Sequence, residues 1–97
     1  MPTYITLINW TEKGISNIKE APQRIDAFKK AVEAKGGKVT NFYVTMGKYD
    51  IVSTVELPSD EAAAAILLST GSKGNVRTET LKAFTEDEFR KIIAKLP

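Results

Sequence analysis

The chain has 97 residues, of which 42% are hydrophobic and 27% are charged, a composition typical of one globular domain over residues 1–97. The 14 basic and 12 acidic residues leave a net charge of +2, which gives no reason to expect a nucleic acid or a membrane surface as partner. Cysteine and histidine are both absent, which excludes disulfides, thiol nucleophiles and the commonest transition-metal ligands. We therefore expect no cofactor and no metal.

The longest apolar run in the chain is Ala62–Leu68, far short of the roughly 20 residues that span a bilayer. The first residues carry no basic segment followed by a long apolar stretch, so no signal peptide is predicted. Together with the lack of cysteine, this favours a cytoplasmic protein.

Three elements are predicted in the first third of the chain. Residues 4–10 are rich in β-branched and aromatic side chains, which predicts a strand. Residues 11–21 are polar and contain glycine, which indicates a long loop, with a short turn of helix as the alternative. Apolar residues then recur at helical spacing, and Pro22 and Gly36 suit the first turn and the end of a helix over 22–35.

Two strands are predicted in the middle of the chain, over residues 38–46 and 49–56. Only Gly47 and Lys48 lie between them. A two-residue link is typical of a tight antiparallel hairpin, in which Gly47 supplies a positive φ.

The last third is predicted to contain a helix, a strand and a final helix. Ser59 is a good N-cap for a helix over 60–70 that ends at Gly71, and residues 75–84 read as a strand. Thr85 opens a capping box before the final helix. The final helix carries an apolar stripe, which we expect to dock on the domain or on a neighbouring molecule. The stripe consists of Phe89, Ile92, Ile93 and Leu96.

The order of these elements is β-α-β-β-α-β followed by an extra C-terminal helix, which is the ferredoxin-like pattern of the α+β class. Right-handed crossovers place both long helices on one face of a four-stranded antiparallel sheet and leave the other face bare. The first two strands lack a clean polar side, and a monomer rarely exposes so large an apolar surface. We therefore expect a homodimer with the sheets face to face, or a higher oligomer. The interface is predicted to include Tyr4, Thr6, Ile8, Thr78 and Thr80.

The stretch Gly47-Lys48-Tyr49-Asp50, which follows Tyr43-Val44-Thr45-Met46, resembles the signature of the GYD-domain proteins of bacteria and archaea. Residues 7–15, 71–78 and 83–89 resemble the same family. The resemblance implies a ferredoxin-like fold of the dimeric α/β-barrel kind. The same turn is similar to the effector-binding domain of leucine- and asparagine-responsive regulators, in which small ligands bind between subunits. The broader group includes cofactor-free monooxygenases and haem-degrading enzymes, whose haem-ligating histidine is missing here.

A ligand site is predicted where strand ends meet loops, a common position for binding residues. Asp50 and Tyr49 offer an acceptor and a donor, and Arg24 suits a carboxylate or phosphate. The alternatives are structural: Asp50 binds nearby backbone N–H groups, Arg24 is a surface residue, and Trp10 is part of the core or an interface. The full set of candidates is Gly47, Tyr49, Asp50, Asn9, Trp10, Asn17 and Arg24.

Two further features have a functional and a structural interpretation. Glu56, Arg77 and Glu79 either form a buried polar cluster or make ordinary cross-strand ion pairs. The loop at residues 71–75 either approaches a phosphate through backbone N–H groups or only connects a helix to a strand.

Three classes of function remain on this basis. The first is an oligomeric module that binds or senses a small ligand near the subunit interface. The second is a structural or interaction oligomer without a ligand, and the third is a cofactor-independent enzyme of the α/β-barrel monooxygenase type. Only analogy of fold supports the enzyme, and the missing histidine counts against it.

Overall fold

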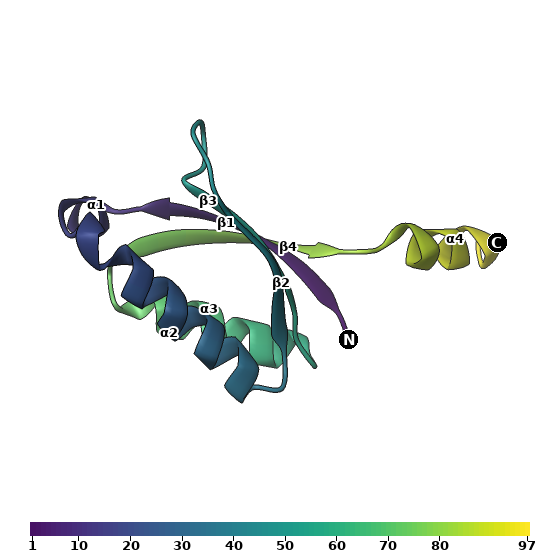
Figure 1. The fold of residues 1–97 in the computed structure, drawn as a ribbon. Coiled ribbons are helices and arrows are strands. Elements are labelled where there is room, and N and C mark those ends of the chain that lie inside the picture. Colours follow the sequence, from purple (N-terminus) through teal and green to yellow (C-terminus); the bar gives the residue numbers. More distant parts are fainter.

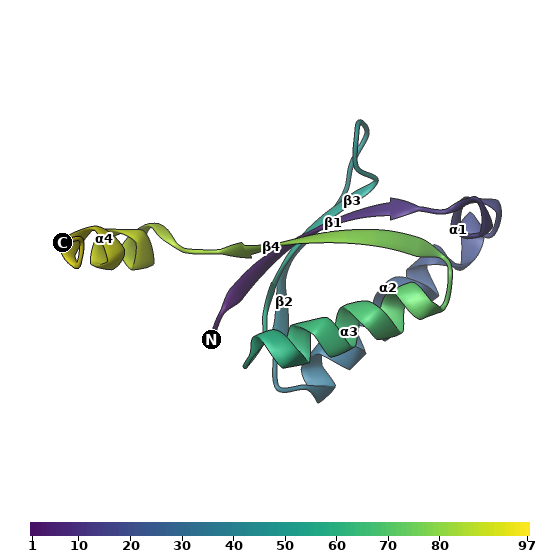
Figure 2. The ribbon, with the colours of Figure 1, turned by 180° about the vertical axis from the view of Figure 1, so that it is seen from behind.

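The computed structural model describes residues 1–97. Its elements are, in chain order, β1 (Thr3–Trp10), α1 (Glu12–Ser16), the 3-10 helix η1 (Ile18–Glu20), α2 (Ala21–Ala34), β2 (Lys38–Val44), β3 (Ile51–Glu56), α3 (Asp60–Ser72), β4 (Val76–Ala83) and α4 (Glu86–Ala94). The four strands form one antiparallel sheet in the order β2-β3-β1-β4. Helices α2 and α3 lie side by side on one face of this sheet (Figures 1 and 2). The ferredoxin-like α+β architecture with an extra C-terminal helix is thereby confirmed.

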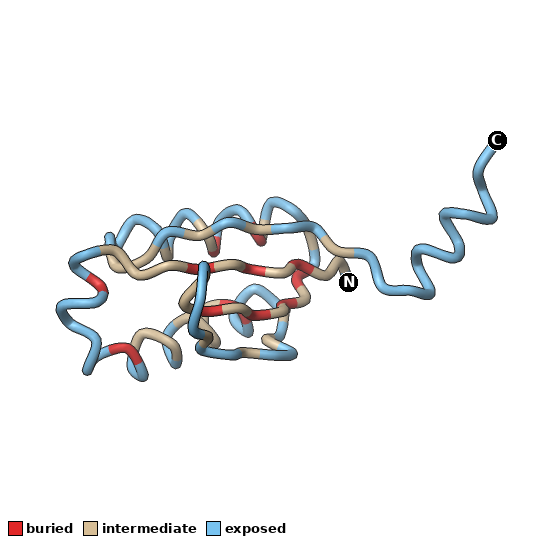
Figure 3. The backbone as a smooth tube through the Cα atoms, turned by 90° about the horizontal axis from the view of Figure 1, so that it is seen from above, coloured by how far each residue is buried: buried red, intermediate tan, exposed pale blue.

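The core lies between the sheet and the two long helices. Its central cluster consists of Tyr4, Val32, Val55, Leu57, Ala63 and Ile66, each at most 5% exposed. Buried residues alternate along β1 and β3, as expected for strands with one covered face. Figure 3 shows most of the buried positions on the central strands and on the helices that overlap them in this view, with two more at the end that holds α1 and the start of α2.

The residues predicted to form the subunit interface lie on the face of the sheet that the helices cover, so they cannot form that interface. Tyr4, Thr6 and Ile8 are 4%, 1% and 4% exposed and face the helices. The strand register pairs Thr6 with Thr80 and Ile8 with Thr78, so these two threonines lie on the same covered face. The sequence of a strand separates its residues into two sides but does not tell which side the helices cover. The side predicted to be uncovered is the covered one, so the prediction is wrong.

The opposite face carries no helix, and its exposed centre is partly apolar. Leu7 on β1 pairs with Val52 on β3, and Val52 pairs in turn with Tyr43 on β2. Ile5 pairs with Leu81 on β4, and Tyr43 and Leu81 are 61% and 47% exposed. We call this surface of five residues the free sheet face.

The hairpin between β2 and β3 is longer than predicted. The strands end at Val44 and begin again at Ile51, so the link is not the expected two residues. The backbone N–H of Thr45 donates to the carbonyl of Asp50 (2.8 Å), and its hydroxyl donates to the carbonyl of Tyr49 (2.5 Å). These bonds hold a wider loop in which Gly47 has the expected positive φ, at 140°.

Helical structure extends further than predicted at two places. Residues 11–21, expected to form a long loop or to contain a short turn of helix, contain both α1 and η1, so the helical alternative is confirmed. The hydroxyl of Thr11 accepts from the N–H of Gly14 (3.1 Å) as an N-cap. Helix α3 continues through Gly71 instead of ending there. The left-handed residue that follows the helix is Gly74, with φ of 78°.

Helix α4 stands away from the rest of the molecule on the short segment after β4 (Figure 1). Its capping box is present, since Thr85 and Glu88 each bind the other's backbone N–H (2.7 and 3.1 Å). Every residue of α4 is exposed, including the apolar stripe. The prediction that this helix docks on its own domain is therefore wrong, and docking on a neighbouring molecule stays a prediction.

No helix in this chain combines the length and the apolar character that crossing a membrane requires.

A polar cluster joins the first strand to the start of α3. The buried hydroxyl of Tyr4 donates to the carboxylate of Asp60 (2.5 Å), which also pairs with the ammonium of Lys82 (3.2 Å). Burial, helped by the hydrogen bond to Asp60, raises the pKa of Tyr4 to about 12. The donated hydrogen bond from Tyr4, and then that from Lys82, lower the pKa of Asp60.

This cluster predicts a loss of stability at alkaline pH. Between pH 10 and 12 the unfolded tyrosine loses its proton and the folded one keeps it, so the free energy of unfolding falls, by about 2 kcal/mol over that range. Below pH 10 the contribution is fully present. Urea unfolding at several pH values should show this fall in the wild type and not in Tyr4→Phe. Tyr43→Phe, on the free sheet face, serves as the control, and an identical alkaline slope in all three proteins would contradict the assignment.

Candidate functional site

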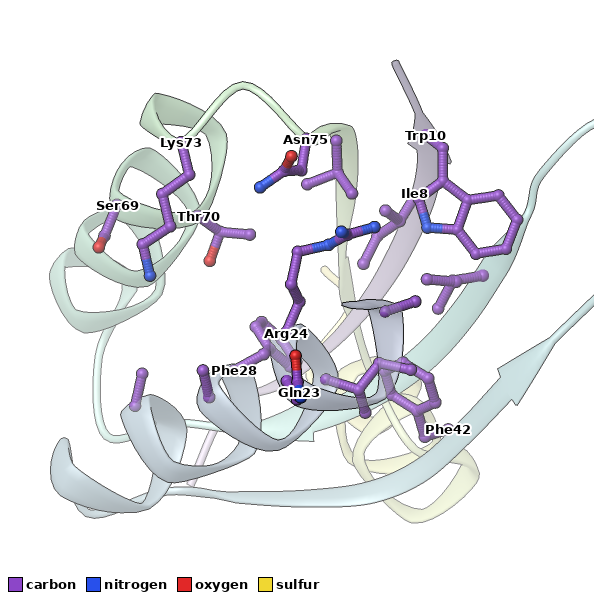
Figure 4. A pocket seen from close by; sticks show the side chains of 16 residues that line it. Ile8, Trp10, Gln23, Arg24, Phe28, Phe42, Ser69, Thr70, Lys73 and Asn75 are labelled. Carbon is purple, nitrogen blue, oxygen red and sulfur yellow. The ribbon is translucent and has the colours of Figure 1, made fainter. Parts of the chain in front are cut away.

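A pocket of about 250 Å³ lies between α2, α3 and the sheet (Figure 4). Ten of its 16 lining residues are hydrophobic. Ile8 and Ile51 form its floor on the sheet, and Phe28 on α2 and Phe42 on β2 add aromatic surface. A mainly apolar hollow with a few polar groups is the usual form of a small-molecule site.

Small side chains form part of the pocket wall on α2. Ala21, Ala27 and Ala31 line it at positions where larger residues would fill the space. They share one helical stripe with Phe28, which packs against the core. The sequence pattern that predicts α2 therefore also leaves the hollow beside it.

Arg24 is held at the pocket by two hydrogen bonds to backbone carbonyls. Its terminal nitrogens donate to Asn17 (3.0 Å) and to Gly14 (3.1 Å), at the end of α1. Figure 4 shows the guanidinium reaching between Asn75 and Trp10. The side chain thus closes one end of the pocket and carries a positive charge into its wall.

The segment after α3 forms the opposite side of the pocket. Lys73 and Asn75 both line it, and both lie in the loop for which an anion site or a simple connection is predicted. The backbone N–H of Thr11 donates to the carbonyl of Asn75 (3.0 Å), and the Thr11 hydroxyl donates to the carbonyl of Gly74 (2.6 Å). These bonds fix the loop against α1.

Asp50 and Asn9 form a separate structural junction. The carboxylate of Asp50 accepts from the backbone N–H of Trp10 (3.0 Å), and the backbone N–H of Asp50 donates to the side chain of Asn9 (3.1 Å). The same N–H also donates to the carbonyl of Ile8 (3.0 Å). Both side chains tie the hairpin loop to the end of β1, and neither lines the pocket.

The other predicted site residues are spread over the molecule. The hydroxyl of Tyr49 donates to Glu79 (3.3 Å), and Gly47 lies in the hairpin loop, where an added Cβ would meet no atom within 4 Å. The side-chain amide of Asn17 donates to the carbonyl of Lys13 (3.0 Å). Of the seven candidates, the structure brings only Trp10 and Arg24 into the pocket.

The buried cluster considered for Glu56, Arg77 and Glu79 is not formed. Glu56 lies opposite Lys38 and pairs with it across the strands (3.7 Å), whereas Arg77 and Glu79 are exposed on β4. The register aligns Glu56 with Thr3 and Arg77 with Asn9, at opposite ends of β1. Cross-strand pairing, the structural alternative, therefore applies to Glu56.

Sequence reasoning misses the apolar residues that α2 supplies to the pocket, whereas Arg24 on the same helix and the loop at residues 71–75 are among its candidates. Phe28 reads as part of a core stripe, and nothing in its spacing distinguishes a packed face from one bordering a cavity. The usable signal is the set of alanines on the same stripe. The described chain contains no group of three or more acidic residues placed to hold a metal ion.

Comparisons with known proteins give one family and several relatives. The sequence profile of the GYD domain matches residues 4–93. The chain is 34% identical over 84 residues to a Thermus thermophilus protein named glutamine synthetase and cystathionine beta-lyase binding protein, covering 86% of this chain and 88% of that protein. A solved structure of a protein from Thermus thermophilus is 28% identical, with a TM-score of 0.55, over 88% of this chain and 95% of that one.

A more distant likeness concerns the fold alone. The feast or famine regulatory protein from M. tuberculosis, solved in complex with L-methionine, superposes with a TM-score of 0.62 at 22% identity. The match covers 90% of this chain and 54% of the regulator, so the chain spans about half of that protein's length.

Proposed function

The chain belongs to the GYD domain family, and from this premise we propose that it is a homo-oligomeric module that binds a small ligand in the pocket between α2, α3 and the sheet. The pocket itself carries the proposal. It is concave, mainly apolar and bordered by two cationic side chains, Arg24 and Lys73. Its volume of about 250 Å³ suits a metabolite somewhat smaller than a typical drug molecule.

The proposed ligand site lies within one subunit. The pocket is on the helix side of the sheet, and the free sheet face is on the other side. This differs from the sequence-based expectation of a site near the subunit interface. The methionine complex of the mycobacterial regulator supports the idea that this fold can hold a small metabolite.

Pairing of two copies is supported by the apolar centre of the free sheet face. A layer of side chains such as Leu7, Val52 and Leu81 is seldom left in water by a soluble protein. A second copy of the same face would cover it by twofold symmetry, the commonest arrangement of homo-oligomers.

The pocket proposal is tested by filling the hollow. Ala27→Leu, in the pocket wall, is expected to remove the thermal shift caused by small apolar metabolites and the accompanying change in Trp10 fluorescence. Trp10 is the only tryptophan and lines the pocket, so its emission reports on this site. The matched control is Ala34→Leu, an exposed position on the same helix outside the pocket. Equal ligand responses in both variants would show that binding occurs elsewhere.

A second candidate function, a protein-binding module, is favoured by one observation. The apolar stripe of α4 is uncovered, with Phe89 and Leu96 55% and 62% exposed. The Thermus relative is named for binding two enzymes, which supports the same idea. Removal of α4 should then abolish protein binding and leave ligand binding in the pocket intact.

An acid–base enzyme is supported least. The pocket lining includes no carboxylate and no tyrosine, the groups that would take the place of the missing histidine. Tyr4, whose pKa is raised, donates its hydrogen bond to Asp60 and lies outside this lining.

A further inference from the structure

The charged residues in the wall of the pocket are all cations. Arg24 and Lys73 line it, and no aspartate or glutamate does. The ion pairs of the molecule are Lys38–Glu56, Lys82–Asp60 and Arg90–Glu86, all outside the pocket. Two positive side chains thus border an apolar cavity without an acidic partner within 4.0 Å.

The guanidinium of Arg24 is fixed and still has free donors. A guanidinium carries five N–H groups. Arg24 uses two hydrogen bonds to hold the carbonyls of Asn17 and Gly14, which fix its direction without neutralising its charge. A guanidinium held in this way is suited to bind a planar carboxylate, and little side-chain entropy is lost when it does so.

Lys73 adds a second positive charge from the other side. Figure 4 shows Lys73 on the α3 side of the pocket and Arg24 on the α2 side. The Lys73 side chain makes no hydrogen bond, whereas its backbone carbonyl accepts from the ammonium of Lys13 (2.9 Å). A third cation therefore lies beside the same loop.

Building on the proposed function, we propose that the ligand is a small organic monocarboxylate, with its carboxylate bound by Arg24 and Lys73 and its apolar body against Phe28 and Ile8. The absence of acidic side chains has a specific consequence. The ammonium group of an amino acid would lose water in this pocket without gaining an anionic partner. A carboxylic acid should therefore bind better than the amino acid with the same side chain.

Three probes that share one apolar body test the proposal: 3-phenylpropionate, 3-phenylpropanamide and L-phenylalanine. Trp10 fluorescence titrations at pH 7 should show the acid binding at least about tenfold more tightly than either other probe. An amide or amino acid that binds as tightly as the acid would overturn the monocarboxylate assignment and leave the pocket's role in binding intact. If none of the three changes Trp10 emission or the melting temperature, the ligand class and the proposed function both fail.

Two substitutions locate the carboxylate. Lys73→Gln removes a side chain without hydrogen bonds, so the fold should persist, and affinity for 3-phenylpropionate should fall about tenfold with no change for the amide. Arg24→Lys keeps the positive charge but loses the planar set of guanidinium donors that binds both oxygens of a carboxylate. Affinity for 3-phenylpropionate should therefore fall by a similar factor. Lys30→Gln, an exposed position on α2 outside the pocket, is the control for lost charge and should leave affinity unchanged.

The carboxylate assignment fails if Lys73→Gln and Arg24→Lys both bind the acid as the wild type does. It also fails if excess inorganic phosphate displaces 3-phenylpropionate as effectively as an aliphatic monocarboxylate of similar size does. Arg24 and Lys73 would then recognise anions of any class and not carboxylates in particular.

Discussion

Replacing Gly14 with alanine is expected to destabilise the protein by about 3 kcal/mol and to distort the pocket. Gly14 is buried in α1, and an added Cβ would lie 2.0 Å from the carbonyl oxygen of Asn75. That oxygen accepts the backbone N–H of Thr11, and the carbonyl of Gly14 accepts from Arg24. The methyl group would therefore separate α1 from the loop after α3 and displace Arg24. Thermal unfolding should show a decrease in melting temperature of more than about 10 °C.

Gly71→Ala provides the matched control for this substitution. Gly71 lies inside α3, and an added Cβ there would meet no atom within 4 Å. Alanine is the better helix former by about 1 kcal/mol, so this variant should melt at the same or a higher temperature. Equal stability of the Gly14 and Gly71 variants would mean that the close contact between α1 and the loop does not exist in solution.

Much of the fold was predictable because it depends on local patterns. The β-branched and aromatic residues at 4–10 and the helical stripe of residues 22–35 identify a strand and a helix from local sequence alone. The capping box at Thr85 is a similar local signal, and it occurs as predicted. The face of the sheet that the helices cover is a tertiary property, and for this reason the side predicted for Tyr4 and Ile8 is wrong.

The candidate site was predictable only in part, because it depends on which distant segments meet. Arg24 and Trp10 stand out in the sequence for their chemistry, and the fold places both in the pocket. Asp50 also stands out in the sequence for its chemistry. Its carboxylate accepts a hydrogen bond from the backbone N–H of Trp10 at the end of β1, so it has a structural role. Lys73 and Arg24 border the same pocket only because α3 packs beside α2 on the sheet, and no spacing in the sequence encodes that arrangement.

Leu7→Lys is expected to weaken self-association by a factor of about 100 or more, because burial of one leucine is worth about 1.5–3 kcal/mol and two symmetry-related lysines would repel each other. Leu7 lies on the central strand, beside Val52 and Glu79, with no helix over it. In an isolated subunit the lysine chain can lie along the free sheet face and pair with Glu79 across the strands. The substitution should therefore act on association and leave the fold intact.

Sedimentation velocity at micromolar concentrations is the measurement for this prediction. Leu68→Lys introduces the same charge at a position on α3 that is 74% exposed and away from the free sheet face, so it should sediment as the wild type does. A shortened chain ending at Phe84 separates the contribution of α4 from that of the sheet. Because the pocket lies on the other side of the sheet, the Leu7 variant should still bind 3-phenylpropionate as a monomer. Wild-type protein that sediments as a monomer would show that the free sheet face tolerates water and that two copies do not cover it.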